Sequence, residues 1–123
     1  MSNPEDRRQY FRLSLDSRYT LRFEVEGRVF RCVEMTNLST GGVGLKLSHR
    51  EAIRLPAGTT LKGIVFEHPS LPRVKVDGEV RHLIGQNLNN AEGMILVGVQ
   101  YLNPSPGVLH LIEEFIARRL DMV

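Results

Sequence analysis

The sequence has one cysteine, no tryptophan and no long apolar run, and each scarcity excludes a class of protein. Cys32 cannot form an intramolecular disulfide, so we expect a reducing compartment and a small, buried side chain at this position. The longest run of apolar residues and glycine, Met94–Val99, is too short to cross a bilayer. The N-terminal residues also lack the apolar segment of a signal peptide. We therefore expect a cytoplasmic protein that is not inserted into a membrane.

The residue patterns of catalysis and metal binding are missing too. The four histidines stand far apart, and none has a second histidine or a cysteine at metal-ligand spacing. No serine lies in a nucleophile-elbow pattern, and no lysine follows a phosphate-binding glycine loop. The carboxylates do not form pairs that would suggest acid–base chemistry. We therefore expect a binding module with no metal or cofactor rather than an enzyme.

The positive charge is informative in kind rather than in amount. A net charge of only +2 argues against a protein that binds long nucleic acids. Thirteen of the sixteen basic residues, however, are arginine, and seven of these precede residue 32. Arginine pairs in a bidentate way with phosphates and with guanine edges, and it stacks on rings. The arginine-rich first quarter therefore hints at a phosphate-bearing, aromatic ligand.

Short strands with turns between them make up most of the chain, which has the length of one domain. Tyr19–Glu26 alternates between apolar and polar residues, as a half-buried strand does. Further strand-like segments cover Val29–Met35, Val43–Leu47, Thr60–Glu67, Val74–Leu83 and Met94–Leu102. Repeated short strands without a helix among them predict an antiparallel barrel or sandwich.

Only the C-terminal residues have helical periodicity. Ser105 and Pro106 form a suitable cap and first helical position. Apolar residues then recur at spacings of three and four, at Leu109, Ile112, Ile116 and Leu120. This spacing predicts a helix over about 107–121. We expect its apolar stripe to pack on the sheet, with an oligomer contact as the alternative.

Two polar motifs stand out from this pattern. Near the N-terminus, Arg7, Arg8 and Arg12 enclose two aromatic residues. Further on, Asn37–Gly44 joins two strands through an amide, a hydroxyl and three glycines within four residues. A hairpin turn needs at most one or two glycines, so the surplus suggests a close approach to the backbone. Together the motifs suit a ligand with two phosphates and flat bases.

Arg8 and Arg12, with three residues between them, followed by Asn37, Ser39 and Gly42, resemble the signature of the PilZ domain family. The order of the β segments and the closing helix extend this resemblance over nearly the whole chain. It implies a mainly β fold, a six-stranded antiparallel split β-barrel with a C-terminal α-helix. It also implies cyclic di-GMP, a bacterial second messenger, as the ligand.

The resemblance further implies roles for single residues. Arg8 and Arg12 would clasp the phosphates and contact guanine, and Asn37, Ser39 and Gly42 would hold a guanine from the barrel side. Arg7 matches family members that take two intercalated ligand molecules. The family more often has aspartate where this chain has Asn37. An amide offers one acceptor oxygen and no charge, so affinity would be lower by ~1–2 kcal/mol.

We expect residues 1–15 to form a flexible segment that carries the arginine motif, and residues 16–123 to form the barrel domain. Ligand binding would order that segment and so relay the signal to an unidentified protein partner. Two alternatives belong to other classes. One is a ligand-independent adaptor of PilZ type, and the other is a small barrel that binds single-stranded nucleic acid.

Overall fold

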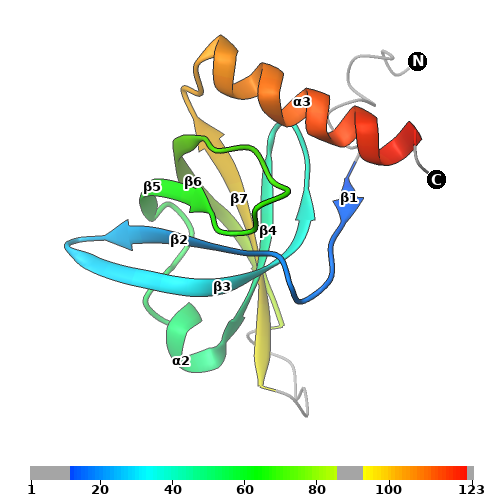
Figure 1. The fold of residues 1–123 in the computed structure, drawn as a ribbon. Helices are drawn as coiled ribbons and strands as arrows, with labels where there is room; N and C mark the ends of the chain where they lie inside the picture. The colour runs from blue at the N-terminus through cyan, green and yellow to red at the C-terminus, as the bar shows by residue number, and fades with distance from the viewer. Residues whose placement is uncertain (1–11, 86–92, 122–123) are drawn as a thin grey trace, which may run out of the picture.

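The computed structural model describes residues 12–85 and 93–121 of the chain (Figure 1). Among these residues, seven strands form one antiparallel sheet in the order β1-β3-β2-β5-β6-β7-β4, and an additional pairing of β3 with β4 closes it. Six strands therefore make a closed barrel, and β1 is an extra strand beside β3. The strands are β1 (Leu13–Ser14), β2 (Thr20–Val25), β3 (Arg28–Leu38), β4 (Gly42–Ser48), β5 (Thr60–Phe66), β6 (Lys75–Ile84) and β7 (Met94–Leu102).

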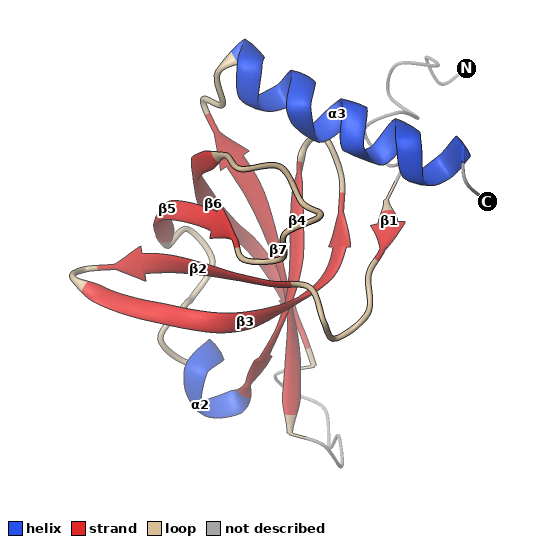
Figure 2. Ribbon diagram, viewed as in Figure 1, coloured by secondary structure: helices blue, strands red, loops and turns tan. Residues whose placement is uncertain are grey.

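Two helices complete the described fold, α2 (His49–Ala52) and α3 (Pro106–Asp121). Figure 2 shows them in blue at opposite ends of the barrel. The predicted six-stranded antiparallel barrel with a C-terminal helix is confirmed. We expected residues 1–15 to form a segment separate from the barrel domain. Strand β1 belongs to that range and is part of the sheet, while residues 1–11 lie outside the described part of the chain.

Every second residue along the barrel strands faces inward, and these residues fill the barrel interior. Aromatic rings of β2 and β3 stack inside it, with the centroids of Phe23 and Phe30 separated by 5.0 Å. Fully buried aliphatic and methionine side chains come from all six barrel strands, including Leu21, Met35, Leu38, Leu45, Leu61, Ile64, Val80 and Ile95. The period-two pattern read from the sequence is therefore the pattern of the core.

Strand β3 contains a bulge that the sequence did not indicate. Leu21 pairs with Val33 and Phe23 with Phe30, so two residues of β3, Arg31 and Cys32, face one residue of β2. Cys32 adopts a positive φ of 55°, and its side chain is exposed. The prediction of a buried cysteine is wrong, because the extra residue of a bulge is turned out of the regular alternation.

The connection after β4 contains a short helix, although the sequence predicted no helix among the strands. Ser48 caps α2: its Oγ accepts a hydrogen bond from the Glu51 amide at 3.1 Å, and the Glu51 carboxylate accepts one from the Ser48 amide at 3.1 Å. Serine followed three residues later by glutamate is the sequence signature of this capping box. The signal was present, but four helical residues are too few to show a periodicity.

Helix α3 begins as predicted and lies across one end of the barrel (Figure 1). The Ser105 hydroxyl caps it by accepting a hydrogen bond from the Val108 amide at 3.2 Å. Ile112 and Ile116 are buried in the barrel core, which confirms that the stripe packs on the sheet. Leu120, expected in the same stripe, is 42% exposed. No helix of the described residues is long and apolar enough to cross a membrane.

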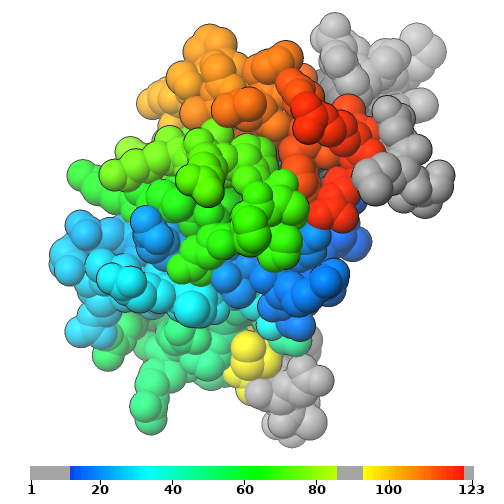
Figure 3. Space-filling model, viewed as in Figure 1, coloured from blue at the N-terminus to red at the C-terminus, as the bar shows by residue number. Residues whose placement is uncertain are grey.

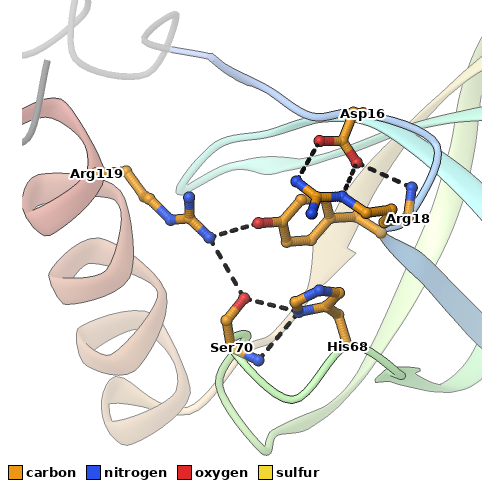
Figure 4. A network of polar contacts seen from close by, with 6 residues as sticks. Asp16, Arg18, His68, Ser70 and Arg119 are labelled. Atoms are coloured by element: carbon orange, nitrogen blue, oxygen red, sulfur yellow. Dashed lines mark hydrogen bonds and ion pairs between the residues drawn. The ribbon is translucent and has the colours of Figure 1, made fainter.

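A polar network fastens the last turn of α3 to the barrel (Figure 4). The Arg119 guanidinium donates to the Tyr19 hydroxyl at 2.5 Å and to Ser70 Oγ at 3.4 Å. Ser70 Oγ lies 2.7 Å from Nδ1 of His68, whose ring stacks on Tyr19 with centroids 4.3 Å apart. The helix is thus tied to the start of β2 and to the loop after β5.

The turn between β1 and β2 is held by a separate exposed pair. Arg18 donates to the Asp16 carboxylate from Nε at 3.0 Å and from Nη2 at 2.8 Å, and its backbone amide donates as well. These hydrogen bonds, the side-chain ones first, lower the pKa of Asp16 from 3.8 to about 2. The pair shapes the turn that directs β1 alongside β3.

Replacing Ile112 by alanine should cost the domain about 2–4 kcal/mol of unfolding free energy, because it leaves a cavity between α3 and the barrel. The neighbouring Leu111 is 45% exposed, so Leu111→Ala should change this free energy by less than about 0.5 kcal/mol. Urea unfolding of both variants measures the difference. Equal losses would show that α3 does not pack through the Ile112 face.

Candidate ligand-binding groove

A groove of about 800 Å³ lies on the outer face of the barrel, beside α3. It is lined by parts of β3, β4, β6 and β7, by the turn between β3 and β4, and by Leu109 and Glu113 of α3. Four of the six predicted site residues border it: Arg12, Asn37, Ser39 and Gly42. The other two, Arg7 and Arg8, lie outside the described residues.

The extra strand β1 brings the two motifs together. Leu13 pairs with Leu38 and Ser14 with Asn37, and the Leu15 amide donates to the Thr36 carbonyl at 3.0 Å. Arg12 directly precedes this pairing, so it reaches the groove next to the end of β3. Residues that are distant in the sequence therefore border one site.

Ser39 shapes the turn between β3 and β4. Its side chain is only 7% exposed, and its hydroxyl accepts from the amides of Gly41 (3.3 Å) and Gly42 (3.1 Å) and donates to the Gly42 carbonyl (3.2 Å). The Ser39 amide also donates to the Gly42 carbonyl at 2.9 Å. The hydroxyl therefore fixes the loop, a role that the sequence did not reveal. Its contact with a ligand stays a prediction.

Gly42 is required by the packing of β4 against β7. A Cβ atom at this position would lie 1.9 Å from the Val99 carbonyl oxygen. The adjacent Gly41 carbonyl accepts a hydrogen bond from the Tyr101 amide at 3.0 Å, which holds the turn against β7. The surplus glycine of the loop thus has a cause within the fold. That Gly42 also leaves room for a base stays a prediction.

The floor of the groove is a row of four residues that runs straight across four strands. Asn37 pairs with Gly44, Gly44 with Gly98, and Gly98 with His82. A Cβ atom added at Gly44 would lie 2.6 Å from Asn37 Nδ2, and one added at Gly98 would lie 2.2–2.9 Å from the His82 ring. Both would collide with the side chain at that end of the row. An amide and an imidazole therefore lie flat on bare backbone.

Several polar groups of the groove are open to a ligand. Asn37 Nδ2 donates to Thr36 Oγ1 at 3.4 Å, and no described residue donates to its Oδ1. Arg12 is exposed, and Arg81 lies 3.6 Å from Glu79. Among the described residues the groove lining has one carboxylate, Glu113; Arg81 is already paired with Glu79, so Arg12 is the arginine that is open to an anionic ligand. No group of three metal-ligating side chains occurs among the described residues.

Two residues of the groove floor were missed by sequence reasoning. The histidines were given no functional role, yet the His82 ring lines the groove. Gly98 lies inside a strand, a position at which glycine often marks a close approach of another group. That signal could have been read. Nothing in the sequence indicated His82, because its place depends on the register of β6 against β7.

Comparison with known proteins identifies the fold. The family model described as PilZ domain matches residues 6–118. This chain belongs to the PilZ domain family. A curated relative of this PilZ domain is the flagellar brake protein YcgR of Janthinobacterium sp. (strain Marseille), which is 24% identical over 117 residues. The match covers 91% of this chain and 46% of that protein, so the chain spans about half the length of its relative.

Solved structures share the fold at low sequence identity. The PilZ domain with c-di-GMP of YcgR from Escherichia coli has a TM-score of 0.73 and 20% identity, and the match covers 95% of this chain and 99% of that one. The MrkH–c-di-GMP complex of K. pneumonia has a TM-score of 0.73 and 17% identity, with 90% and 51% covered. The barrel of this PilZ domain is therefore that of its relatives.

Gly42→Ala should lower the unfolding free energy by about 1–3 kcal/mol, because the new methyl group meets the backbone of β7. Gly41→Ala is the matched control, since a Cβ there has Ser39 Oγ at 4.0 Å as its one close neighbour. Denaturant titration of the two variants makes the comparison. A Gly42→Ala variant as stable as Gly41→Ala would contradict the close packing of β4 on β7.

Proposed function

We propose that this PilZ domain binds cyclic di-GMP in the groove and acts as a receptor for it. The observation that carries the proposal is that Arg12 and the Asn37–Gly42 turn, encoded far apart, border one groove. The PilZ domain of YcgR and the MrkH protein have both been solved with c-di-GMP, which supports the same ligand class here. Arg8, Arg12, Asn37, Ser39 and Gly42 are the proposed ligand contacts, and Arg7 adds to them.

The chemistry of the groove matches the parts of this ligand. Arg12 can pair in a bidentate way with a phosphate or with the O6/N7 edge of guanine. Oδ1 of Asn37, to which no described residue donates, can accept a hydrogen bond from the guanine N1/N2 edge. The Asn37 amide and the His82 ring cover the bare backbone at Gly44 and Gly98, and the His82 ring offers a flat base a stacking surface.

Two ligand molecules per chain are the proposed stoichiometry. Arg7 and Arg8 are adjacent, so with Arg12 the site has three guanidinium groups close together in the sequence. Two intercalated dinucleotides bring four phosphate charges, and a third arginine helps to neutralise them. Calorimetry reports this number directly.

Ligand binding would act as a switch by ordering the N-terminal arginine segment over the groove, for recognition by an unidentified protein partner. The position of α3 supports a wider response, because Leu109 and Glu113 of this helix line the same groove. A ligand that occupies the groove would therefore meet both Arg12 and the C-terminal helix.

Arg12→Ala and Arg8→Ala should each weaken cyclic di-GMP binding by about 1.5–3 kcal/mol, at least about tenfold in Kd, because each removes a charge-assisted hydrogen bond. Isothermal titration calorimetry gives both affinity and stoichiometry. Arg73→Ala is the control, since it removes the same charge from an exposed position that does not line the groove. If Arg12→Ala binds as tightly as Arg73→Ala, the groove is not the binding site.

Asn37→Asp should tighten cyclic di-GMP binding by about 1–2 kcal/mol, because a carboxylate presents two charged acceptors to the guanine N1/N2 edge. The Thr36 hydroxyl can donate to the new carboxylate, so the local structure is kept. Asn103→Asp adds the same charge at an exposed position outside the groove and should leave Kd unchanged. Unaltered or weaker binding by Asn37→Asp would exclude contact between this side chain and the guanine edge.

A further inference from the structure

Four arginines gather at the end of the barrel opposite α3. Arg28 and Arg31 belong to β3, Arg50 to α2, and Arg54 follows α2; together they border a hollow of about 340 Å³. Figure 1 shows α2 below β3, and Figure 3 shows these two segments in contact on the visible face. We call these four residues the arginine patch.

The arginine patch carries an excess of positive charge among the described residues. All four side chains are exposed, and none takes part in an ion pair with a described carboxylate. Glu51 is the one acid among the described residues that line the hollow, and its carboxylate accepts hydrogen bonds from the Ser48 amide and hydroxyl. Four like charges around one hollow repel one another, and an anionic occupant would relieve that repulsion.

Exposed aliphatic side chains accompany the charges. Val29 lines the same hollow and is 46% exposed, and Ile53, between Arg50 and Arg54 in the sequence, is 74% exposed. Arginine is enriched at protein–protein interfaces and their buried centre is apolar, so exposed aliphatic groups beside these arginines fit such an interface.

We propose that the arginine patch is a docking surface for an acidic segment of a partner protein. Carboxylates of that segment pair with the guanidinium groups, and its aliphatic side chains cover Val29 and Ile53. Arginine suits this occupant because its planar fork binds carboxylates in a bidentate way.

The shape and composition of the arginine patch favour a protein over a membrane or a nucleic acid. Its arginines surround a hollow, which a protruding side chain can fill and a flat lipid surface cannot. In the described part of the chain, Phe30 is the one aromatic residue that lines the hollow, and it is buried in the barrel core, so it offers no ring for base stacking.

The arginine patch is separate from the cyclic di-GMP groove. The two hollows share no lining residue, and they lie on different parts of the barrel. The docking proposal therefore does not rest on cyclic di-GMP binding. Either proposal can be wrong while the other is right. If both hold, one domain has a ligand face and a partner face.

A fluorescent peptide of alternating glutamate and leucine tests the proposal by anisotropy, against a matched peptide of alternating glutamine and leucine. The wild-type domain should bind the glutamate peptide more tightly, and added salt should weaken that binding. Arg50→Glu with Arg54→Glu should weaken it by at least about tenfold, ~1.4 kcal/mol. Arg28→Glu with Arg31→Glu should have the same effect, which covers the case that one pair fails to fold.

Arg73→Glu with Arg118→Glu is the charge-matched control, because both arginines are exposed and lie outside the arginine patch. It should keep the wild-type affinity for the glutamate peptide, and all variants should keep the wild-type melting temperature. Equal weakening in the control and in the patch variants would overturn the proposal, since overall charge would then explain the binding. Equal affinity for the two peptides would also overturn it. So would binding to phosphatidylglycerol vesicles that depends on the arginine patch, if the glutamate peptide does not bind.

Discussion

The change of partner along β3 is the interaction on which this structure depends. The strand is eleven residues long; its first half pairs with β2, and its second half pairs with β4 on one side and β1 on the other. The bulge at Arg31 and Cys32 allows the change, because an extra residue bends the strand and increases its twist. Without the pairing of β3 with β4 the sheet would stay open. Without the pairing of β3 with β1 the groove would lack Arg12.

Much of the fold could be predicted because local patterns decide it. Alternation along Tyr19–Glu26 identified a barrel strand, and the Ser105 cap with the spacing of Ile112 and Ile116 identified α3. The exposure of Cys32 could not be predicted in this way. A bulge is set by the register of two strands, which depends on how the whole barrel closes rather than on the residues around the cysteine.

The candidate site was predicted in composition but only partly in mechanism. The motifs named Arg12, Asn37, Ser39 and Gly42, and the structure places all four on one groove. Both Ser39 and Gly42 also have structural roles: the Ser39 hydroxyl closes the turn, and Gly42 allows β7 to approach β4. His82 reaches the groove through strand register alone, so no inspection of neighbouring residues could have found it. Two of the motif residues, Ser39 and Gly42, thus have structural roles in the turn besides the ligand contacts proposed for them.

The shortness of β1 has a thermodynamic consequence. Only two residues of it pair with β3, so this edge can separate at a much lower free energy than the closed barrel around it. Any ligand that needs Arg12 in place must supply the free energy that keeps the edge joined. The strength of the Leu13–Leu38 pairing therefore enters the apparent affinity, and sequence changes there could adjust the concentration at which the domain responds without altering a ligand contact.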